Sequence, residues 1–192
     1  MHYNLQPFFV LFLVLVAAER AWEMFIKKTS RETGVIAYKW SLTALIITYN
    51  TVLLSTVVEL VSIKRQTSLS FSLCGLLLFV FSFILRNWAI ITLGRFHSTN
   101  IEIKPGHTLI IQGPYKYIRH PYYLSVMIEV LSIPLTVNSL YTVLLGLILY
   151  VPCVLMRIYL EEQVFQETFG EEYVRYKEEV RAFVPFRVFN KI

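Results

Sequence analysis

A polar segment near the middle of the chain concentrates the side chains best suited to chemistry. Residues 97–123 read HSTNIEIKPGHTLIIQGPYKYIRHPYY and hold His97, His107 and His120. Pro105–Gly106 and Gly113–Pro114 each mark a turn within the segment. His120 and Pro121 lead into an apolar stretch, and proline is well tolerated in the first turn of a helix. The free N–H groups at such a helix start suit a carboxylate, including that of a methionine-type ligand.

A second group of ionisable residues follows the last apolar stretch. Arg157 and Glu161 are four residues apart, so they share one face of a helix, and Glu162 comes next. One interpretation makes Arg157 an interfacial anchor and the glutamates solvated, since exposed ion pairs are common and weak. The other makes them functional, because ionisable residues at membrane level are functional candidates. The residues alone leave both interpretations open.

The elements that position these groups are apolar helices. The chain is 56% hydrophobic and 16% charged, whereas soluble domains are about 45–50% apolar and about 25% charged. Three apolar stretches cover residues 5–25, 38–63 and 69–93. A fourth, 122–156, exceeds the roughly 20 residues of one span, and Pro134, Asn138 and Ser139 mark a turn in it. We therefore predict one all-α, polytopic membrane domain with about five transmembrane helices, the last two covering residues 121–135 and 139–157.

The basic residues predict how this domain lies in the membrane. The net charge is +5, and lysine and arginine gather after the first, third and fifth expected spans. Basic loops stay in the cytosol, so we expect the N-terminus outside and cytosolic segments at residues 94–120 and 158–192. The residues behind this prediction are Arg20, Lys27, Lys28, Arg31, Lys39, Arg95, Lys104, Lys116, Arg119, Arg157, Arg175, Lys177, Arg181, Arg187 and Lys191, against only Lys64 and Arg65 after the second span.

The C-terminal segment has a helical pattern with a break at Gly170. Its aromatic residues recur at spacings of four, four and three, which predicts one aromatic stripe on a cytosolic helix packed on the membrane face. The stripe consists of Phe165, Phe169, Tyr173 and Tyr176.

Several other classes of function are disfavoured by the sequence. The charges form no single dense patch, which argues against nucleic-acid binding. Cys74 and Cys153 both lie in apolar runs, so we expect packing residues and neither a disulfide nor a metal site. No lysine or arginine precedes the first apolar run, so no cleaved signal peptide is expected.

Specific strings in the second half of the chain resemble a known family. GPYKYIRHPYY, followed by RIYLEE, FGEEYVRYKEEV and VPF, resembles the isoprenylcysteine carboxyl methyltransferase family over residues 90–186. The N-terminal half is similar only in its hydrophobic pattern. Within the family, LGRFHSTNIEIKPGH is most similar to a bacterial branch that methylates alkylpyrone- or alkylresorcinol-like lipids.

The resemblance implies a site for S-adenosylmethionine, the family's cofactor. Glu161 would hold the cofactor and act with Arg157 as the catalytic pair, and Arg157 is the arginine on the substrate side. Asn100 stands where eukaryotic members have glutamine. The residues implied to bind the cofactor are Asn100, His107, Thr108, Leu109, Ile110, Tyr115, His120, Pro121, Tyr122, Tyr123 and Glu161.

The resemblance also implies the reaction and the place where it occurs. We expect an O-methyltransferase of the bacterial inner membrane whose cytosolic C-terminal helices close the cofactor pocket. The acceptor would be lipid-like and dissolved among the membrane lipids, as a prenylcysteine-type carboxylate or an alkylpyrone or alkylresorcinol hydroxyl. The oligomeric state stays open.

Three other functions remain as alternatives. A phospholipid or amine N-methyltransferase would need carboxylates or an aromatic cage facing its acceptor, and an NADPH-dependent membrane reductase shares the RHPxY string. A transporter or scaffold would place ionisable residues at the bilayer midplane. Glu59, Arg86 and Glu129 are the candidates, and we expect them near helix ends or buried against protein, with Glu129 a possible base or lining residue of an acceptor tunnel.

Overall fold

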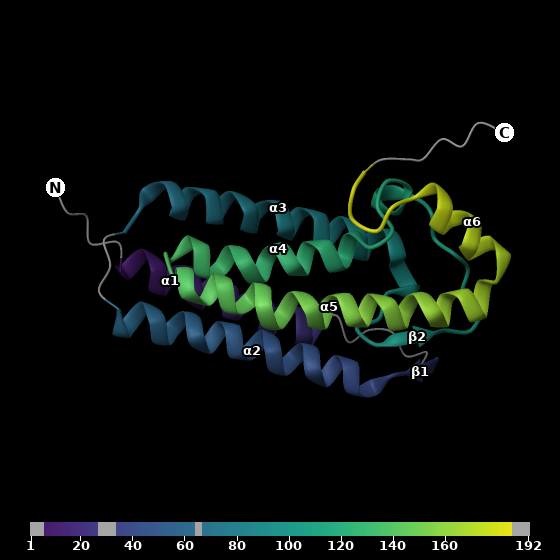
Figure 1. Cartoon of the computed structure of the whole chain (residues 1–192), viewed down its shortest axis with the longest axis horizontal. Coiled ribbons are helices and arrows are strands. Elements are labelled where there is room, and N and C mark those ends of the chain that lie inside the picture. The colour runs from purple at the N-terminus through teal and green to yellow at the C-terminus, as the bar shows by residue number, and fades with distance from the viewer. Residues whose placement is uncertain (1–5, 27–33, 64–66, 186–192) are drawn as a thin grey trace.

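The computed structural model describes residues 6–26, 34–63 and 67–185, and these residues form an all-helical bundle with one short pair of strands (Figure 1). The all-α class is thereby confirmed. The basic residues at 27, 28, 31, 64, 65, 187 and 191 and residue 186 lie outside the described part. The elements are α1 Gln6–Ile26, β1 Val35–Ala37, α2 Lys39–Ser62, α3 Leu69–Leu93, η1 Gly94–Phe96, β2 Ile101–Ile103, η2 Gly113–Lys116, α4 Pro121–Thr136, α5 Leu140–Phe169 and α6 Glu171–Glu179.

Three helices in the described part are long and apolar enough to cross a membrane. They are α2, α5 and α3 together with its continuation to Phe96. The apolar stretch of α1 is shorter, from Pro7 to Ala18, and α4 has 16 residues. The expected number of about five spans therefore stays a prediction, while the three long helices support an integral membrane protein.

Helix α4 occupies the centre of the bundle, between α3 and α5 in Figure 1. None of its residues is exposed, because α2, α3 and α5 all pack against it. The approach of α3 is especially close at Gly75, where an added Cβ would lie 2.5 Å from the backbone nitrogen of Thr136. A short helix with several polar residues is tolerated here because other helices surround it.

Polar contacts fix the end of the bundle opposite the polar loop. Asn138, at φ 61°, forms the expected turn between α4 and α5, and its side chain bonds the backbone N–H of Ser68 (2.9 Å) and the hydroxyl of Ser72 (2.7 Å). Glu59 accepts hydrogen bonds from the backbone N–H groups of Tyr141 and Thr142. Glu59 therefore satisfies free N–H groups at the start of α5, which gives it a structural role.

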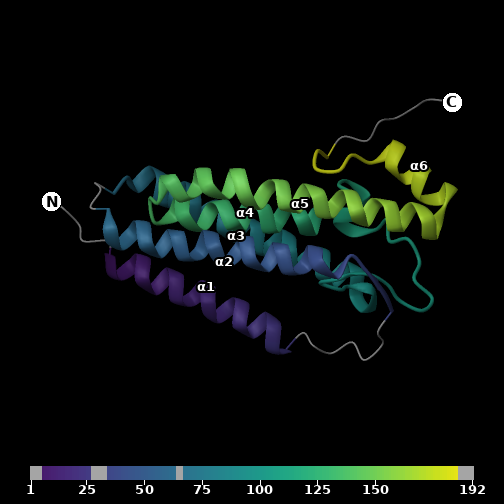
Figure 2. The ribbon, with the colours of Figure 1, turned by 60° about the horizontal axis from the view of Figure 1, so that its bottom comes forward.

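Glu129 lies in a buried ion-pair cluster that connects α1, α3 and α4. Its carboxylate accepts hydrogen bonds from Arg20 Nε (2.8 Å) and from Arg86. Arg86 and Glu129 are each only 1% exposed. Figure 2 shows that α1 diverges from α2 toward the C-terminal end of α1. The hydrogen bond from Arg20 to Glu129 is one of the contacts that hold this half of α1 against the bundle. Glu59, Arg86 and Glu129 are thus buried against protein as expected, and Glu129 is engaged by two arginines.

Candidate active site

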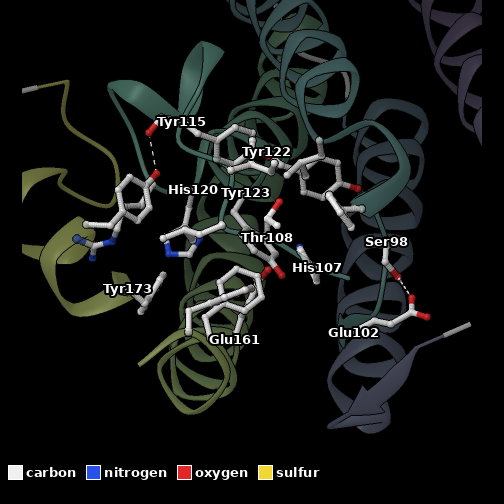
Figure 3. Close-up of a pocket in the computed structure, with 18 of the residues that line it drawn as sticks. Ser98, Glu102, His107, Thr108, Tyr115, His120, Tyr122, Tyr123, Glu161 and Tyr173 are labelled. Atoms are coloured by element: carbon white, nitrogen blue, oxygen red, sulfur yellow. Dashed lines mark hydrogen bonds between the residues drawn. The ribbon is translucent and has the colours of Figure 1, made fainter. Parts of the chain in front are cut away.

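Helix α3 ends, α4 begins and α5 continues toward α6 at one end of the bundle (Figure 1). Residues of these elements and of the loop between α3 and α4 line a pocket there, shown close up in Figure 3. The pocket is partly open to solvent. The walls consist of Leu93, Phe96, Ser98, Asn100, Glu102, His107, Thr108, Leu109, Ile110, Tyr115, Arg119, His120, Tyr122, Tyr123, Glu161, Phe165, Phe169, Tyr173 and Tyr176.

A short β-ladder fixes the first part of the pocket loop. Strand β1 pairs with β2 in antiparallel register, with Val35 opposite Ile103. Glu102 accepts hydrogen bonds from the Ser98 hydroxyl (2.6 Å, dashed in Figure 3) and the Gly34 N–H. Burial alone would raise the pKa of Glu102, but these hydrogen bonds outweigh it and hold that pKa below its usual value. Glu102 thus anchors the wall as a carboxylate.

His107 sits in an aromatic environment on the next part of the loop. Its ring stacks on Phe96, with 4.5 Å between centroids and 6° between planes, and Phe165 and Phe169 meet it edge-on. Burial, together with the positive charge of Lys104, lowers the pKa of His107. The imidazole is therefore neutral at neutral pH and has one donor and one acceptor nitrogen.

Glu162 joins the start of α4 to α6. Its carboxylate contacts Arg119 Nη2 (2.8 Å), His120 Nε2 (3.0 Å) and Lys177 Nζ (2.6 Å). The backbone N–H of Arg119 also donates to the carbonyl of Arg181 (3.0 Å). Three cationic or donor groups from two segments therefore share one carboxylate, and this network fixes α6 beside the pocket.

The aromatic stripe of the C-terminal segment lines the pocket. Gly170, at φ 54°, ends α5 and redirects the chain, so Tyr173 and Tyr176 pack with Leu109 of the loop. Tyr176 donates a hydrogen bond to the carbonyl of Tyr115 (2.7 Å). Burial raises the pKa of Tyr115, Tyr173 and Tyr176, so these phenols stay protonated.

Three buried polar atoms in the pocket wall have no hydrogen-bond partner in the described part of the chain. They are Nδ1 of His107, Oε2 of Glu161 and the hydroxyl of Tyr173. Buried polar groups in proteins are nearly always hydrogen-bonded, so three such atoms on residues that line one pocket are consistent with a site for a polar ligand. S-adenosylmethionine fits these three polar atoms. It offers hydroxyl, amino and ring-nitrogen hydrogen-bond partners, and its positive charge suits the Glu161 carboxylate.

Most of the residues implied by the family resemblance meet in this pocket. Pro121 is the exception among the cofactor candidates, since it is buried as the first residue of α4. Asn100, His107, Thr108, Leu109, Ile110, Tyr115, His120, Tyr122, Tyr123 and Glu161 all line the walls. Nine further residues line the pocket, and the sequence analysis did not assign them to the site. Only the four residues of the aromatic stripe had a recognisable pattern in the sequence, their helical spacing. The nine are Leu93, Phe96, Ser98, Glu102, Arg119, Phe165, Phe169, Tyr173 and Tyr176.

Arg157 lies directly behind the pocket wall and does not line it. It is 2% exposed and donates hydrogen bonds to Tyr123 Oη (3.1 Å) and Ser41 Oγ (2.8 Å). A further bond goes to the carbonyl of Thr99. Tyr123 lines the pocket and Thr99 precedes the lining residue Asn100, so Arg157 supports two parts of the wall at once.

Comparisons with known proteins agree on one family. The model of the "Isoprenylcysteine carboxyl methyltransferase (ICMT) family" matches residues 75–167. The chain is 32% identical to the uncharacterized protein YpbQ of Bacillus subtilis, over 83% of this chain and 97% of that protein. It is also 32% identical to a probable protein-S-isoprenylcysteine O-methyltransferase of Oryza sativa subsp. indica. That match covers 60% of this chain and 61% of the plant protein, so the chain spans about three fifths of that relative.

A solved structure shares the fold. The eukaryotic intramembrane Ras methyltransferase ICMT superposes with a TM-score of 0.56 at 23% sequence identity. The match covers 80% of this chain and 55% of the solved chain. The fold of most of the chain is therefore a known one.

Proposed function

Because the chain belongs to the isoprenylcysteine carboxyl methyltransferase family, we propose that it is an integral membrane enzyme that transfers a methyl group from S-adenosylmethionine to an oxygen of a lipid-like acceptor. The observation that carries this proposal is that His107, Glu161 and Tyr173 line one pocket and that each has a buried polar atom without a hydrogen-bond partner in the described part of the chain. The pocket end of the bundle joins apolar helices to polar segments, which suits one soluble and one membrane-dissolved substrate.

Several residues are suited to hold the cofactor. Glu161 accepts hydrogen bonds from its ribose or amino group and offsets the sulfonium charge. Leu109, Ile110 and Tyr115 supply apolar contacts. His120 already contacts Glu162 through Nε2, so it serves as a hydrogen-bonding group and not as a base. The start of α4 offers free N–H groups for the cofactor carboxylate.

Methyl transfer places modest demands on the chain itself. The bound cofactor supplies an electrophilic methyl group on a positively charged sulfur. The pocket has to align the acceptor oxygen with that methyl group, and positioning alone supplies about 7–11 kcal/mol. A carboxylate acceptor is ionised at neutral pH and needs no base, whereas a hydroxyl acceptor benefits from one.

The proposed role of Arg157 is to orient an anionic acceptor from behind the wall. Its guanidinium donates to Tyr123, which lines the pocket, and to the carbonyl of Thr99 beside Asn100, so it positions the wall residues that would face the acceptor. We predict that Arg157→Ala lowers kcat/KM for the acceptor at least about tenfold, since bonds to charged groups contribute about 1.5–3 kcal/mol. Initial-rate kinetics with varied acceptor would measure this.

Arg157→Lys serves as the matched variant, because it keeps the charge without the planar fork. It should recover part of the loss. The affinity for S-adenosylmethionine should change less than acceptor kinetics in both variants. Acceptor kinetics that stay at the wild-type level in Arg157→Ala would remove this role.

The proposed orientation places the pocket in the cytosol of a bacterium and the N-terminus outside the inner membrane. Many basic residues of the described part lie in the segments that build the pocket end, and basic segments stay in the cytosol. They include Arg95, Lys104, Lys116, Arg119, Arg175, Lys177 and Arg181.

The experiment that tests the function follows a labelled methyl group. The full chain in liposomes is given S-adenosylmethionine with a tritiated methyl group and one of three acceptors: a prenylated cysteine, an alkylresorcinol or phosphatidylethanolamine. Mild base releases methanol from a methyl ester but leaves an aryl ether or N-methyl product intact. Base-labile label on the prenylated cysteine, or stable label on the alkylresorcinol, supports O-methylation and identifies the acceptor class. Label on phosphatidylethanolamine alone would support the amine alternative instead.

A further inference from the structure

The outer face of α2 carries a regular stripe of exposed residues. Helix α2 forms the lower edge of the bundle in Figure 1, and only 17% of its most apolar window is buried, less than in α3 or α5. Beside Ile46, Thr51 and Val58, which are also exposed, six exposed positions between residues 43 and 61 recur at spacings of four, three, four, three and four residues, the period of helix pairs that pack side by side. These positions, named here the α2 seam, are Thr43, Ile47, Asn50, Leu54, Val57 and Val61.

The side chain of Asn50 is a polar amide on the outer face of α2, where a surface that faces only lipid would favour an apolar residue. It lies near the middle of α2, far from either polar end, and it is exposed. Its Nδ2 donates to the Ile46 carbonyl of the same helix (2.7 Å). An amide has two donors and a carbonyl acceptor, and no residue in the described part outside α2 bonds to it. Leaving these groups in hydrocarbon is costly.

We propose that the α2 seam is the interface between two copies of this chain, with the Asn50 amides bonded to each other. Two copies inserted in the same direction are related by a two-fold axis along the membrane normal, so each residue on that axis meets its own counterpart at the same depth. The amide is self-complementary, because each copy supplies a donor and an acceptor. Small and apolar seam residues pack around it.

The polar amide, and not the apolar stripe, is what selects a second copy as the occupant. Lipid tails cover isoleucine, leucine and valine as well as another helix does. Lipid tails cannot bond to Asn50, whereas an interhelical amide pair can. The proposal does not depend on the methyl-transfer reaction, since no seam residue lines the pocket.

Self-association of the full chain in liposomes tests the proposal. Donor- and acceptor-labelled copies are mixed over a range of protein-to-lipid ratios, and energy transfer gives the dissociation constant. Wild type is expected to associate, and Asn50→Leu should raise the dissociation constant about 3- to 30-fold, as loss of one interhelical hydrogen bond in a membrane does. Asn87→Leu is the matched control, because Asn87 makes the same bond to its own helix, Nδ2 to the Phe83 carbonyl (2.8 Å), but lies on α3.

Crosslinking checks the geometry without disturbing Asn50. In a Cys74→Ser, Cys153→Ser background, Leu54→Cys should form a disulfide-linked dimer under mild oxidation. Leu45→Cys should not, because Leu45 packs inward against the core. The proposal is overturned if wild type stays monomeric at every density, or if Asn50→Leu associates as well as wild type. An equal loss in Asn87→Leu, or no selective crosslink at Leu54→Cys, would also overturn it.

Discussion

Replacing Glu161 with glutamine is expected to weaken S-adenosylmethionine binding by about ten- to a hundredfold, because hydrogen bonds to charged groups contribute about 1.5–3 kcal/mol. Glutamine keeps the size of the side chain and removes its charge. Oxygen Oε2 of Glu161 is buried without a hydrogen-bond partner in the described part of the chain. The loss should therefore fall on ligand binding and not on the fold.

Isothermal titration of the purified variant measures this effect. Glu167→Gln is the matched control, since Glu167 lies on the same helix but is exposed and does not line the pocket. Its affinity should equal that of wild type. If Glu161→Gln binds the cofactor as tightly as wild type does, the assignment of Glu161 is wrong.

Replacing Glu162 with glutamine is expected to release α6 from the pocket. The change removes the carboxylate that Arg119, His120 and Lys177 share, and the side chain is only 13% exposed. Hydrogen bonds to a charged group contribute about 1.5–3 kcal/mol each, whereas the pair with Lys177, which is 45% exposed, contributes less. Because Tyr173 and Tyr176 of α6 line the pocket, cofactor affinity should fall at least tenfold as well.

Hydrogen exchange measured by mass spectrometry distinguishes this local effect from general unfolding. Amides of residues 171–182 should exchange faster in Glu162→Gln, while those of α4 keep their protection. Glu178→Gln, an exposed change on α6 itself, should leave exchange unaltered. Wild-type protection of residues 171–182 in Glu162→Gln would show that other contacts hold α6.

Local signals allowed much of the fold to be predicted from the sequence. Asn138 and Ser139 marked a turn because asparagine tolerates positive φ, and Asn138 adopts φ 61° there. Gly170 marked a helix break and ends α5 at φ 54°. The loop histidines and tyrosines were found because their order and spacing match a family pattern, and most of them line one pocket.

The features that sequence reasoning missed depend on contacts between distant segments. The β1–β2 pair joins residues near 36 to residues near 102, and strands of three residues leave no periodic signal. The placement of Tyr173 and Tyr176 depends on the direction in which the chain leaves Gly170. The position of Arg157 behind the wall depends on Ser41 and Thr99, neither of which shares a motif with it. Tertiary contacts decided each of these positions.

Equilibrium binding of S-adenosylmethionine to the purified wild-type chain in lipid nanodiscs tests the central claim most directly. We predict saturable micromolar binding at one site per chain, displacement by S-adenosylhomocysteine, and weaker binding in His120→Ala and Glu161→Gln. Absence of binding by wild-type protein that retains its full helical circular dichroism would contradict the assignment of this pocket as a methyl-donor site.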